Sequence, residues 1–529
     1  MKRFAAMLMA SLMLLALLPA MAEVSLPLVD SPVTLTCFME TDVKWSATRN
    51  SVAEVSAYAL IMEKTGVKVE FIHPAAGQTS EQFNLMIASN MLPDMIFYNW
   101  AGVAGGPAKY IDDGVIIALN EYLDKWAPHF LAYMEKYPDV RKQSVLDDGT
   151  YYCFPMLRID EEAGAGQWFK VAGNMIRQDW LDALGLSMPT TLEELHTVLK
   201  AFREQDPNGN GEKDEIPWAT TKEYSLDPFA GMFGILNGFY MDGSEVKFGP
   251  SQPAFRDYLA TMRDWYAEGL IDPEYAMTDA SSLTSKVTLN QVGSMYYLLA
   301  GGMGTWSNMM KDTAFNLQAM PWPRLNADSP AYATSSDYNK VVTGPGVAIT
   351  TACAADPAKL EAAIRFRDYF YSDEGVLDSN FGVEGESYTL VDGEPVFTDA
   401  VLANDKGLTT TQALSQFVLS ASNDAMVKTA KYFKQVTLAL ENQKASQAVW
   451  NQCDISLLLP NVAQTAEESA FIAERMNEID TYTGEMIMKY VLGQESLDSF
   501  DTFVSNIDKL GIAEVLKMKQ AAYDRYMAR

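Results

Sequence analysis

One short stretch of the chain has the residue types and the spacing that bind a hard cation. Residues 206–217 read D-P-N-G-N-G-E-K-D-E-I-P. Oxygen-bearing side chains stand at alternating positions, as in loops that wrap calcium, and a glycine at the sixth position permits a sharp turn. The candidate ligands are the side chains of Asp206, Asn208, Asn210 and Asp214, the backbone carbonyl of Glu212, and the carboxylate of Glu215. This spacing predicts a structural calcium site.

The loop departs from the EF-hand pattern at its twelfth position. That position is Pro217, which has no side-chain ligand, so the missing carboxylate must come from nearby, and Glu215 is the candidate. An ordinary solvated turn is the alternative, because Asp, Asn and Gly are common turn residues. The four oxygen-bearing side chains at alternate positions favour the cation site.

The N-terminus predicts export. Lys2 and Arg3 precede an uncharged apolar run at residues 4–18, and Ala20-Met21-Ala22 supplies the small residues that a signal peptidase reads. The run is shorter than the roughly 20 residues that span a bilayer. We therefore expect a signal peptide at residues 1–22 and an exported product that is extracellular, at the cell surface or periplasmic. No Cys stands near the cleavage point, so a lipid anchor is not expected.

Composition excludes several classes of partner. The chain has 529 residues, 48% of them hydrophobic, which is enough for two or three domains with large cores. Loss of Lys2 and Arg3 with the signal would take the formal net charge from −29 to −31. Such an acidic chain is not expected to bind nucleic acid or an anionic membrane. The cysteines have no C-x-x-C spacing and are expected mainly as buried free thiols, and the three histidines do not form a zinc motif.

Apolar periodicity predicts alternating strands and helices. Strands are expected at residues 33–38, 67–72 and 95–98, with helices ending at Gly66 and covering residues 82–89. The functional loops should follow these strands, at residues 39–44, at residues 73–79 and at Asn99 and Trp100. Further on, a capping-box start at Thr190 and Thr191, strands at residues 317–322 and 347–350, and helices at residues 357–371 and from about 465 onward are expected. No linker is seen, which favours lobes joined by several crossings of the chain.

Several stretches together carry a resemblance to a known family. They are N-M-L-P-D at residues 90–94, D-G-T-Y-Y-C-F-P at 148–155, the whole of 175–217, Y-A-E-G-L-I-D-P-E at 266–274, D-E-G at 373–375, G-V-E-G-E-S-Y at 382–388 and A-A-Y-D-R-Y at 521–526. The chain resembles the family 1 extracellular solute-binding proteins of ABC importers. Within that family it is most similar to the large calcium-containing subgroup that includes alginate oligosaccharide binders.

The resemblance implies an α/β fold of the two-lobed periplasmic-binding-protein type (type II), with a hinge and a helical C-terminal region. The first lobe is expected to comprise residues 23–153 and 316–354, and the second residues 154–315 and 355–529. The resemblance also implies the same six calcium ligands, an oligosaccharide held between the lobes, and permease subunits as partners of a monomer. The missing lipid-attachment Cys is a departure from many relatives.

Candidate sugar contacts combine aromatic planes with fixed polar groups, since a sugar stacks its apolar face and hydrogen-bonds its hydroxyls. They are Asn99, Trp100, Gln167, Trp168, Arg177, Trp306, Glu384 and Glu386. Each Trp could equally be a core anchor, and Arg177 could pair with Asp179 or Asp182. The glutamates lie in a turn that its glycines alone could explain, and Tyr296 and Tyr297 are expected in the core.

Three functions fit these features, and the binding protein fits them best. A secreted, calcium-stabilised carbohydrate-active enzyme would need a pair of carboxylates at catalytic spacing, which counting cannot exclude among 69 acidic residues. The chain has no G-x-S-x-G, H-E-x-x-H or phosphate-loop motif. An adhesin would need a stalk or an anchor. We therefore predict a non-enzymatic carbohydrate binder, with a peptide or another polar solute as the alternative cargo.

Overall fold

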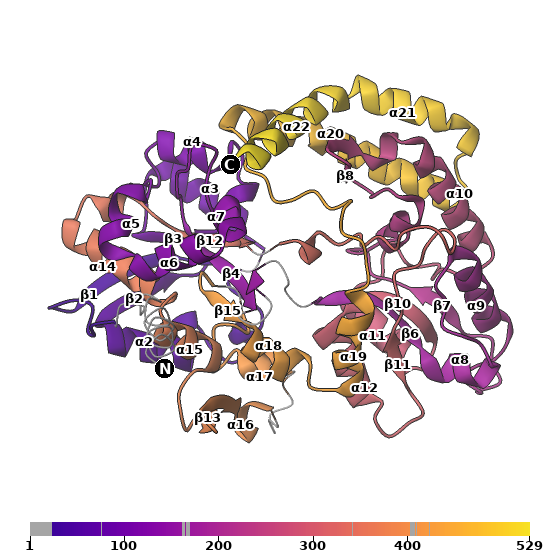
Figure 1. The fold of residues 1–529 in the computed structure, drawn as a ribbon, viewed down its shortest axis with the longest axis horizontal. Coiled ribbons are helices and arrows are strands. Elements are labelled where there is room, and N and C mark those ends of the chain that lie inside the picture. The colour runs from indigo at the N-terminus through magenta and orange to yellow at the C-terminus, as the bar shows by residue number, and fades with distance from the viewer. Residues whose placement is uncertain are drawn as a thin grey trace, which may run out of the picture.

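The chain folds into two lobes, each built on a β-sheet of its own (Figure 1). The computed structural model describes residues 24–75, 77–160, 164–165, 170–340, 342–402, 408, 410–422 and 424–529. The predicted signal peptide at residues 1–22 lies outside this part of the chain. No helix within the described part is both long and apolar enough to cross a bilayer.

The first lobe contains a seven-stranded mixed sheet in the order β15-β4-β12-β3-β1-β2, with the short β5 paired to β4. Strand β1 is parallel to β2 and β3, whereas β12 is antiparallel to β3 and β4. The strands are β1 Val33–Phe38, β2 Val67–Ile72, β3 Met95–Tyr98, β4 Phe154–Asp160, β5 Gly164–Ala165, β12 Val342–Ile349 and β15 Val427–Thr429.

The second lobe contains a four-stranded sheet in the order β11-β6-β10-β7. Strands β7 and β10 are parallel, and β6 is antiparallel to both β10 and β11. The strands are β6 Ala172–Arg177, β7 Ile216–Ala219, β10 Val292–Leu298 and β11 Leu317–Ala319. Two separate ribbons pair β8 Phe239–Asp242 with β9 Glu245–Phe248, and β13 Tyr388–Val391 with β14 Glu394–Phe397.

Helices surround both sheets. Those around the first sheet are α2 Ser56–Thr65, α3 Thr79–Ser89, α4 Gly106–Asp112, α5 Asn120–Trp126, α6 Pro128–Lys136, α7 Pro138–Ser144, α13 Thr351–Ala354, α14 Pro357–Tyr369 and α15 Asp373–Phe381. Those of the second lobe are α8 Gln178–Leu184, α9 Leu192–Glu204, α10 Pro253–Ala267, α11 Ala280–Thr288, α12 Thr305–Met309, α19 Glu441–Trp450, α20 Ala466–Val491, α21 Phe500–Lys509 and α22 Ile512–Ala528. The remaining helices are α16 Asp399–Leu402, α17 Thr410–Leu414 and α18 Ala430–Thr437.

Local sequence explains most of these boundaries. The helix α2 ends at Gly66, whose φ of 73° is a left-handed conformation that glycine adopts without strain. The helix α9 begins with a capping box in which the Thr191 side chain accepts from the Glu194 backbone and the Glu194 side chain accepts in return. The predicted strands at residues 33–38, 67–72 and 95–98 are confirmed at the same bounds.

Each lobe has its own hydrophobic core. The first core packs α2, α6 and α14 against one face of the large sheet, with Leu35, Ile61 and Ile364 fully buried. The second core packs α8, α9, α10 and the C-terminal helices together, with Trp180 and Phe202 at its centre. A third buried cluster connects the lobes, because it combines Met175, Tyr297 and Trp306 of the second lobe with Phe381 of α15, Leu414 of α17 and Tyr432 of α18.

The two sheets divide the chain differently from the predicted lobe boundaries. The strand β4, expected to open the second lobe at residue 154, belongs to the first sheet, as does β15. The strand β11, expected in the first lobe, pairs with β6 of the second. Helices α14 and α15 also pack on the first lobe. Periodicity identifies a strand but not its partner, because pairing is decided by contacts between distant segments.

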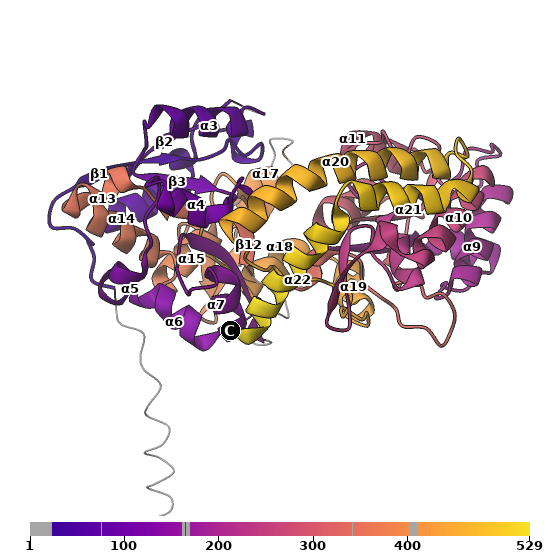
Figure 2. The same ribbon diagram turned by 90° about the horizontal axis from the view of Figure 1, so that it is seen from above.

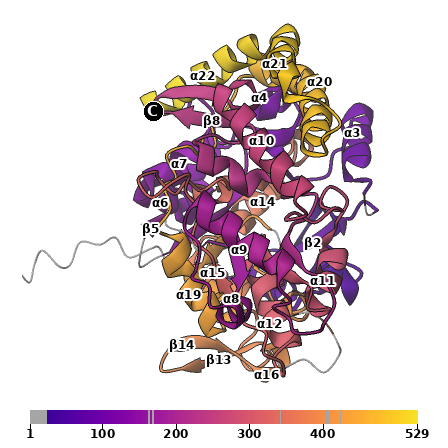
Figure 3. The same ribbon diagram turned by 90° about the vertical axis from the view of Figure 1, so that its right-hand side faces the viewer.

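The C-terminal helices tie the second lobe to the first. They belong to the second core, yet α20 begins beside α4 and the end of α22 lies beside α7 (Figures 2 and 3). Arg525 bridges Asp147 of the first lobe and Glu468 of α20, with 2.9 Å between its Nη1 and Glu468 Oε1. Arg529 also pairs with Asp147. We call this group of ion pairs the C-terminal clasp.

All four cysteines are free thiols, which matches the expectation for Cys37, Cys153 and Cys353. Cys37, Cys153 and Cys353 are buried, and Cys453 is half-buried. Burial raises the pKa of the Cys37 and Cys353 thiols to about 12, so neither forms a reactive thiolate at neutral pH.

The buried ion pair between Arg367 and Asp424 joins α14 to the segment that leads into β15. Arg367 Nη2 lies 3.1 Å from Asp424 Oδ1, and Arg367 Nη1 lies 3.3 Å from the Tyr58 hydroxyl. We expect Arg367→Met to lower the free energy of unfolding by about 3–5 kcal/mol, because it leaves a buried carboxylate without its partner. Chemical denaturation measures this. The control is Arg365→Met, two residues away, which removes a partly exposed pair with Glu361 and should cost less than about 1 kcal/mol. Equal losses in the two variants would contradict this role.

Candidate functional site

Three loops of the first lobe meet where parallel strands end. They follow β1, β2 and β3, as the sequence predicted. The Thr79 hydroxyl donates to Glu40 Oε1 at 3.2 Å, and the Thr41 hydroxyl donates to the carbonyl of Pro74 at 3.0 Å. These bonds hold the loops after β1 and β2 together, beside the end of β3.

A pocket of about 240 Å³ lies at this meeting point. Its lining residues are Glu40, Thr79, Ser80, Phe97, Tyr98, Asn99 and Pro345. Asn99 is exposed there, while Tyr98 is half-buried and stacks on Phe83 with ring centroids 3.9 Å apart. The pocket therefore offers hydrogen-bonding groups beside an aromatic ring, and Asn99 is the predicted ligand residue that the structure places in it.

The second lobe has an aromatic group at the corresponding edge of its sheet. Strands β7 and β10 are parallel, and Tyr224 and Tyr297 lie at or just beyond their C-terminal ends. Their rings meet edge to face with centroids 5.8 Å apart, and Tyr224 is half-buried. Burial raises the pKa of Tyr224 to about 12, so its hydroxyl keeps its proton and can donate a hydrogen bond.

Sequence reasoning missed this aromatic group. It gave Tyr224 no role, whereas its expectation that Tyr297 lies in the core is confirmed, since that side chain is 8% exposed and belongs to a buried hydrophobic cluster. Their place in the sequence could have identified them, since both residues follow or end a strand of the second sheet. The parallel pairing of β7 and β10, which makes that position meaningful, joins segments 76 residues apart and is not visible locally.

Trp100 and Trp306 are core residues. Both are fully buried, with the Trp100 indole donating to the carbonyl of Gly346 at 3.1 Å and the Trp306 indole donating to the Thr284 hydroxyl at 3.2 Å. Trp306 stacks behind Tyr297 with ring centroids 5.1 Å apart. The hypothesis that either indole stacks on a sugar does not match this burial. Trp306 instead supports a residue that lies one layer nearer the surface.

Arg177 is also structural. Its Nε and Nη2 donate to the two carboxylate oxygens of Asp179, and its Nη1 donates to Asn290 Oδ1 at 2.7 Å. The side chain is 2% exposed and lies between the rings of Trp180 and Phe315. The salt bridge to Asp179, which the sequence left open as the alternative, is the observed role.

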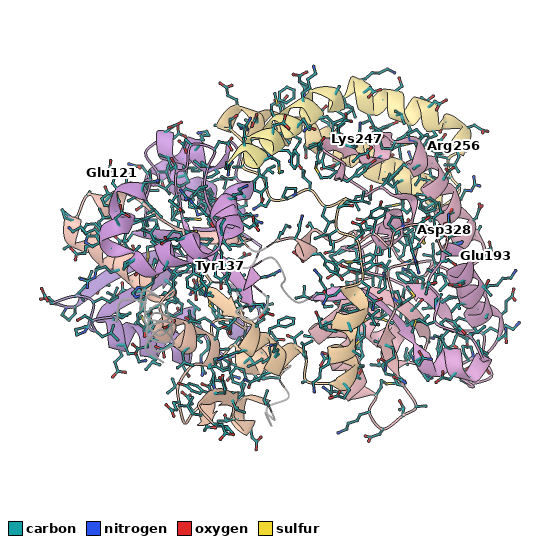
Figure 4. The ribbon with its side chains drawn as sticks, in the orientation of Figure 1. Glu121, Tyr137, Glu193, Lys247, Arg256 and Asp328 are labelled. Carbon is teal, nitrogen blue, oxygen red and sulfur yellow. The ribbon has the colours of Figure 1, made fainter. Side chains whose placement is uncertain are left out.

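The remaining predicted contacts are less central. Glu384 and Glu386 are exposed in the turn before β13, where Glu386 Oε1 accepts from the Ser56 hydroxyl at 3.1 Å. Gln167 and Trp168 lie outside the described residues. Figure 4 shows side chains of both lobes pointing into the region between them, while the labelled Glu193 and Arg256 lie on the far side of the second lobe.

The predicted calcium loop forms a tight turn between α9 and β7. Its oxygens cap its own backbone, because Asp206 accepts from Asn210 at 3.1 Å and from Gly211 at 2.8 Å. Asn210 Oδ1 accepts from the Glu212 backbone at 2.7 Å. Gly211 has a φ of 80°, the left-handed conformation expected at the sixth position.

Asp214 and Glu215 connect the loop to the sheet. Asp214 accepts from Gln291, just before β10, at 2.9 Å, and this hydrogen bond lowers the pKa of its carboxyl group. Glu215 is 4% exposed, and its buried Oε1 has no hydrogen-bond donor. Burial, together with the charges of Asp214 and Asp206, raises the pKa of Glu215. Across the described residues, no three His, Cys, Asp or Glu side chains are gathered as a ready metal site.

The loop and the aromatic group lie at opposite edges of the second sheet. The loop precedes β7 and contacts the residues that precede β10, whereas Tyr224 and Tyr297 lie at the other ends of these strands. Arg177, at the end of the antiparallel β6, holds Asn290 on the loop side. A cation in this loop would therefore act on stability and not touch a ligand at the aromatic edge.

Comparison with known proteins identifies the family. Residues 48–376 match the family of bacterial extracellular solute-binding proteins, so the chain belongs to that family. Among curated proteins, it is 24% identical to the fructooligosaccharide ABC transporter substrate-binding protein FusA of Streptococcus pneumoniae serotype 4, over 88% of this chain and 86% of that protein.

Solved structures give the same architecture. The alginate-binding protein AlgQ2, solved without calcium ion, is 28% identical, with a TM-score of 0.75 over 94% of this chain and 99% of that one. An EF-hand mutant of S. pneumoniae FusA in complex with fructo-nystose is 20% identical, with a TM-score of 0.74 over the same shares. The two-lobed fold predicted from the sequence is confirmed.

The burial of Trp306 leads to a test of its role. We expect Trp306→Ala to lower the free energy of unfolding by about 3–5 kcal/mol, because it leaves a cavity behind Tyr297. Asn99→Ala, at an exposed position in the first-lobe pocket, should change it by no more than about 0.5 kcal/mol. Chemical denaturation of the two variants measures the difference. A Trp306 variant as stable as wild type would contradict the burial.

Proposed function

We propose that this protein is the substrate-binding component of an ABC importer and that it holds an oligosaccharide between its two lobes. The observation that carries the proposal is the pairing of two surfaces. One is the polar pocket around Asn99 on the first lobe, and the other is the aromatic pair of Tyr224 and Tyr297 on the second. Both lie at the C-terminal ends of parallel strands, where open α/β sheets bind ligands.

The chemistry of the two surfaces suits a sugar. A sugar ring presents an apolar face that packs on an aromatic plane and a rim of hydroxyls that need fixed donors and acceptors. Tyr224 and Tyr297 supply aromatic surface, and Glu40, Thr79 and Asn99 supply polar groups. The relatives support a carbohydrate as cargo, since they are named for alginate and for fructooligosaccharide.

The fold supports a mechanism of lobe closure. The chain crosses between the sheets from β5 to β6, from β11 to β12 and from α18 to α19. Because each lobe has a sheet and a core of its own, the lobes can reorient by changes at these crossings and in the apolar cluster around α17 and α18, and leave both sheets intact. A ligand that contacts both lobes stabilises the closed form by its differential affinity for it. The C-terminal clasp has to move with this closure or break.

No catalytic step is part of the proposal. The relatives that the chain resembles are named as binding proteins and not as enzymes. Membership of an extracellular solute-binding family supports export, with release of the cargo to permease subunits at the membrane. We infer that the protein acts as a monomer.

We also propose that residues 206–215 bind calcium. The fit rests on Glu215, whose buried carboxylate oxygen has no donor and lies within electrostatic range of Asp206 and Asp214. A cation held by these carboxylates, with Asn208, Asn210 and the Glu212 carbonyl, would supply the missing positive charge. It would then fasten the loop to the starts of β7 and β10. The solved EF-hand mutant of FusA supports a similar loop in that relative.

Binding and closure can be tested together. Residues 23–529 are titrated with a panel of neutral and uronate oligosaccharides by calorimetry, with small-angle X-ray scattering for closure and product analysis for turnover. We expect saturable binding, a smaller radius of gyration and no breakdown. Tyr224→Ala should weaken binding by about tenfold or more through lost stacking (about 1–3 kcal/mol). Breakdown of the sugar, or binding without closure, would contradict the proposal.

Calcium binding is tested by thermal denaturation without any sugar. We expect millimolar calcium to raise the melting temperature of wild type by several degrees relative to chelator, since a ligand that binds only the folded state stabilises it. Asp206→Ala and Glu215→Gln should lose this response. The control is Glu212→Gln, which keeps the backbone carbonyl and should retain it. Equal melting of wild type in calcium and in chelator would contradict the site.

A further inference from the structure

Two cationic side chains lie next to each other on the first sheet, with no carboxylate at ion-pair distance from either among the described residues. Arg158 of β4 and Lys428 of β15 are direct neighbours in the register of these parallel strands. Their strand neighbours Leu157 and Val427 point into the first core, so Arg158 and Lys428 point to the opposite face. Both are half-buried.

The partners of these side chains are incomplete. Arg158 Nη1 is buried and has no hydrogen-bond acceptor. Lys428 Nζ lies 5.6 Å from the centre of the Tyr432 ring, and it has no carboxylate within ion-pair distance among the described residues. Lys44, the next cation, is already paired with Asp42 at 3.5 Å. The acidic groups that act on this pair electrostatically are Asp337 for Arg158 and Asp42 for Lys428, and neither is at ion-pair distance.

This cationic pair lies at the junction of the lobes. Strand β15 is the edge strand of the first sheet, and Figure 1 shows it on the side that faces the second lobe. The helix α18, which follows β15, contacts β4 in the first lobe and the turn at Leu299–Gly304 in the second. Asp337, between β11 and β12, is an electrostatic neighbour of both Arg158 and Tyr224. The pair therefore lies close to the aromatic edge where the saccharide is proposed to bind.

Burial of unpaired cations needs a compensating anion. Desolvation of a charge costs free energy that a hydrogen-bonded partner of opposite sign offsets. Burial and the neighbouring charges of Arg158 and Lys44 lower the pKa of Lys428 to about 7, with Asp42 acting in the opposite direction. An incoming anion would restore the charged state of the lysine. The planar fork of Arg158 matches a carboxylate, which accepts two parallel hydrogen bonds.

We propose that Arg158 and Lys428 bind the carboxylate of an acidic saccharide, so that the cargo is a uronate-containing oligosaccharide. This inference rests on the proposed function and narrows its substrate class. The relatives do not decide whether the cargo is charged, because their named cargoes include a charged glycan and a neutral one.

The test compares two ligands with the same sugar backbone, one with free carboxylates and one in which methyl esters remove the charge. Oligogalacturonate and its methyl ester are titrated into residues 23–529 by calorimetry, with fructo- and malto-oligosaccharides as further neutral probes. We expect the acid to bind about 30-fold or more tightly than the ester, as for a desolvated charge pair. Lys428→Met and Arg158→Gln should remove most of that difference and leave ester binding within about threefold. The matched control is Lys431→Met, on the exposed side of α18, which should keep the difference.

A pH series provides a readout that needs no variant. The charged groups that face Lys428 are Arg158, Lys44 and Asp42, and Tyr432 covers it. Lys428 is protonated below its pKa of about 7 and loses its proton above it. Because the carboxylate binds the protonated lysine, affinity for the acid should fall by about tenfold between pH 6.5 and 8.5, while affinity for the ester stays constant.

The outcomes separate this inference from the proposed function. Preferential binding of the acid, lost in the two variants and at high pH, supports both. Equal binding of acid and ester, or binding of neutral probes alone, overturns the acidic cargo and leaves the saccharide-binding function standing. A preference for the acid that survives in both variants assigns it to other residues and overturns the role of Arg158 and Lys428. Absence of binding by every saccharide overturns the proposed function and this inference with it.

Discussion

Two separate hydrophobic cores are the constraint on which the rest of the structure depends. Each sheet and its helices form a core of their own, and the lobes are joined by chain crossings, by the C-terminal clasp and by a buried apolar cluster that includes α17 and α18. Reorientation of the lobes therefore has to take place at these connections and can leave both sheets intact. The Arg367–Asp424 pair inside the first core adds rigidity where β15 begins, which fixes the strand that carries Lys428.

The second sheet separates stability from recognition. Its two edges face in opposite directions, with the candidate calcium loop, Arg177 and Asn290 at one edge and Tyr224 and Tyr297 at the other. Charge at the loop edge can thus fasten the starts of β7 and β10 without entering the ligand site. On the recognition side, Trp306 packs behind Tyr297 and holds that ring in place from within the core.

Charged side chains are distributed unevenly over the protein, and the net charge alone does not reveal this. The net charge of −29 describes an acidic surface, yet the junction of the lobes holds Arg158 and Lys428 close together with few acidic partners. Asp337 lies within electrostatic range of both Arg158 and Tyr224 of the second-lobe aromatic group. Closure of the lobes around an anionic ligand would neutralise the cations and shield the charged groups from water, which strengthens their interaction.

The sequence by itself determined the features that depend on neighbours along the chain. These include β1, β2 and β3 at their observed bounds, the capping box of α9 and the turn at Gly211. The loops that meet around Asn99 also followed from the strand pattern. Only the tertiary structure decided which sheet β4, β11 and β15 join, why Trp100 and Trp306 are buried, and that Arg158 lies beside Lys428. The reason is physical: capping and turns are set within a few residues, whereas strand pairing and burial are set by contacts between segments hundreds of residues apart.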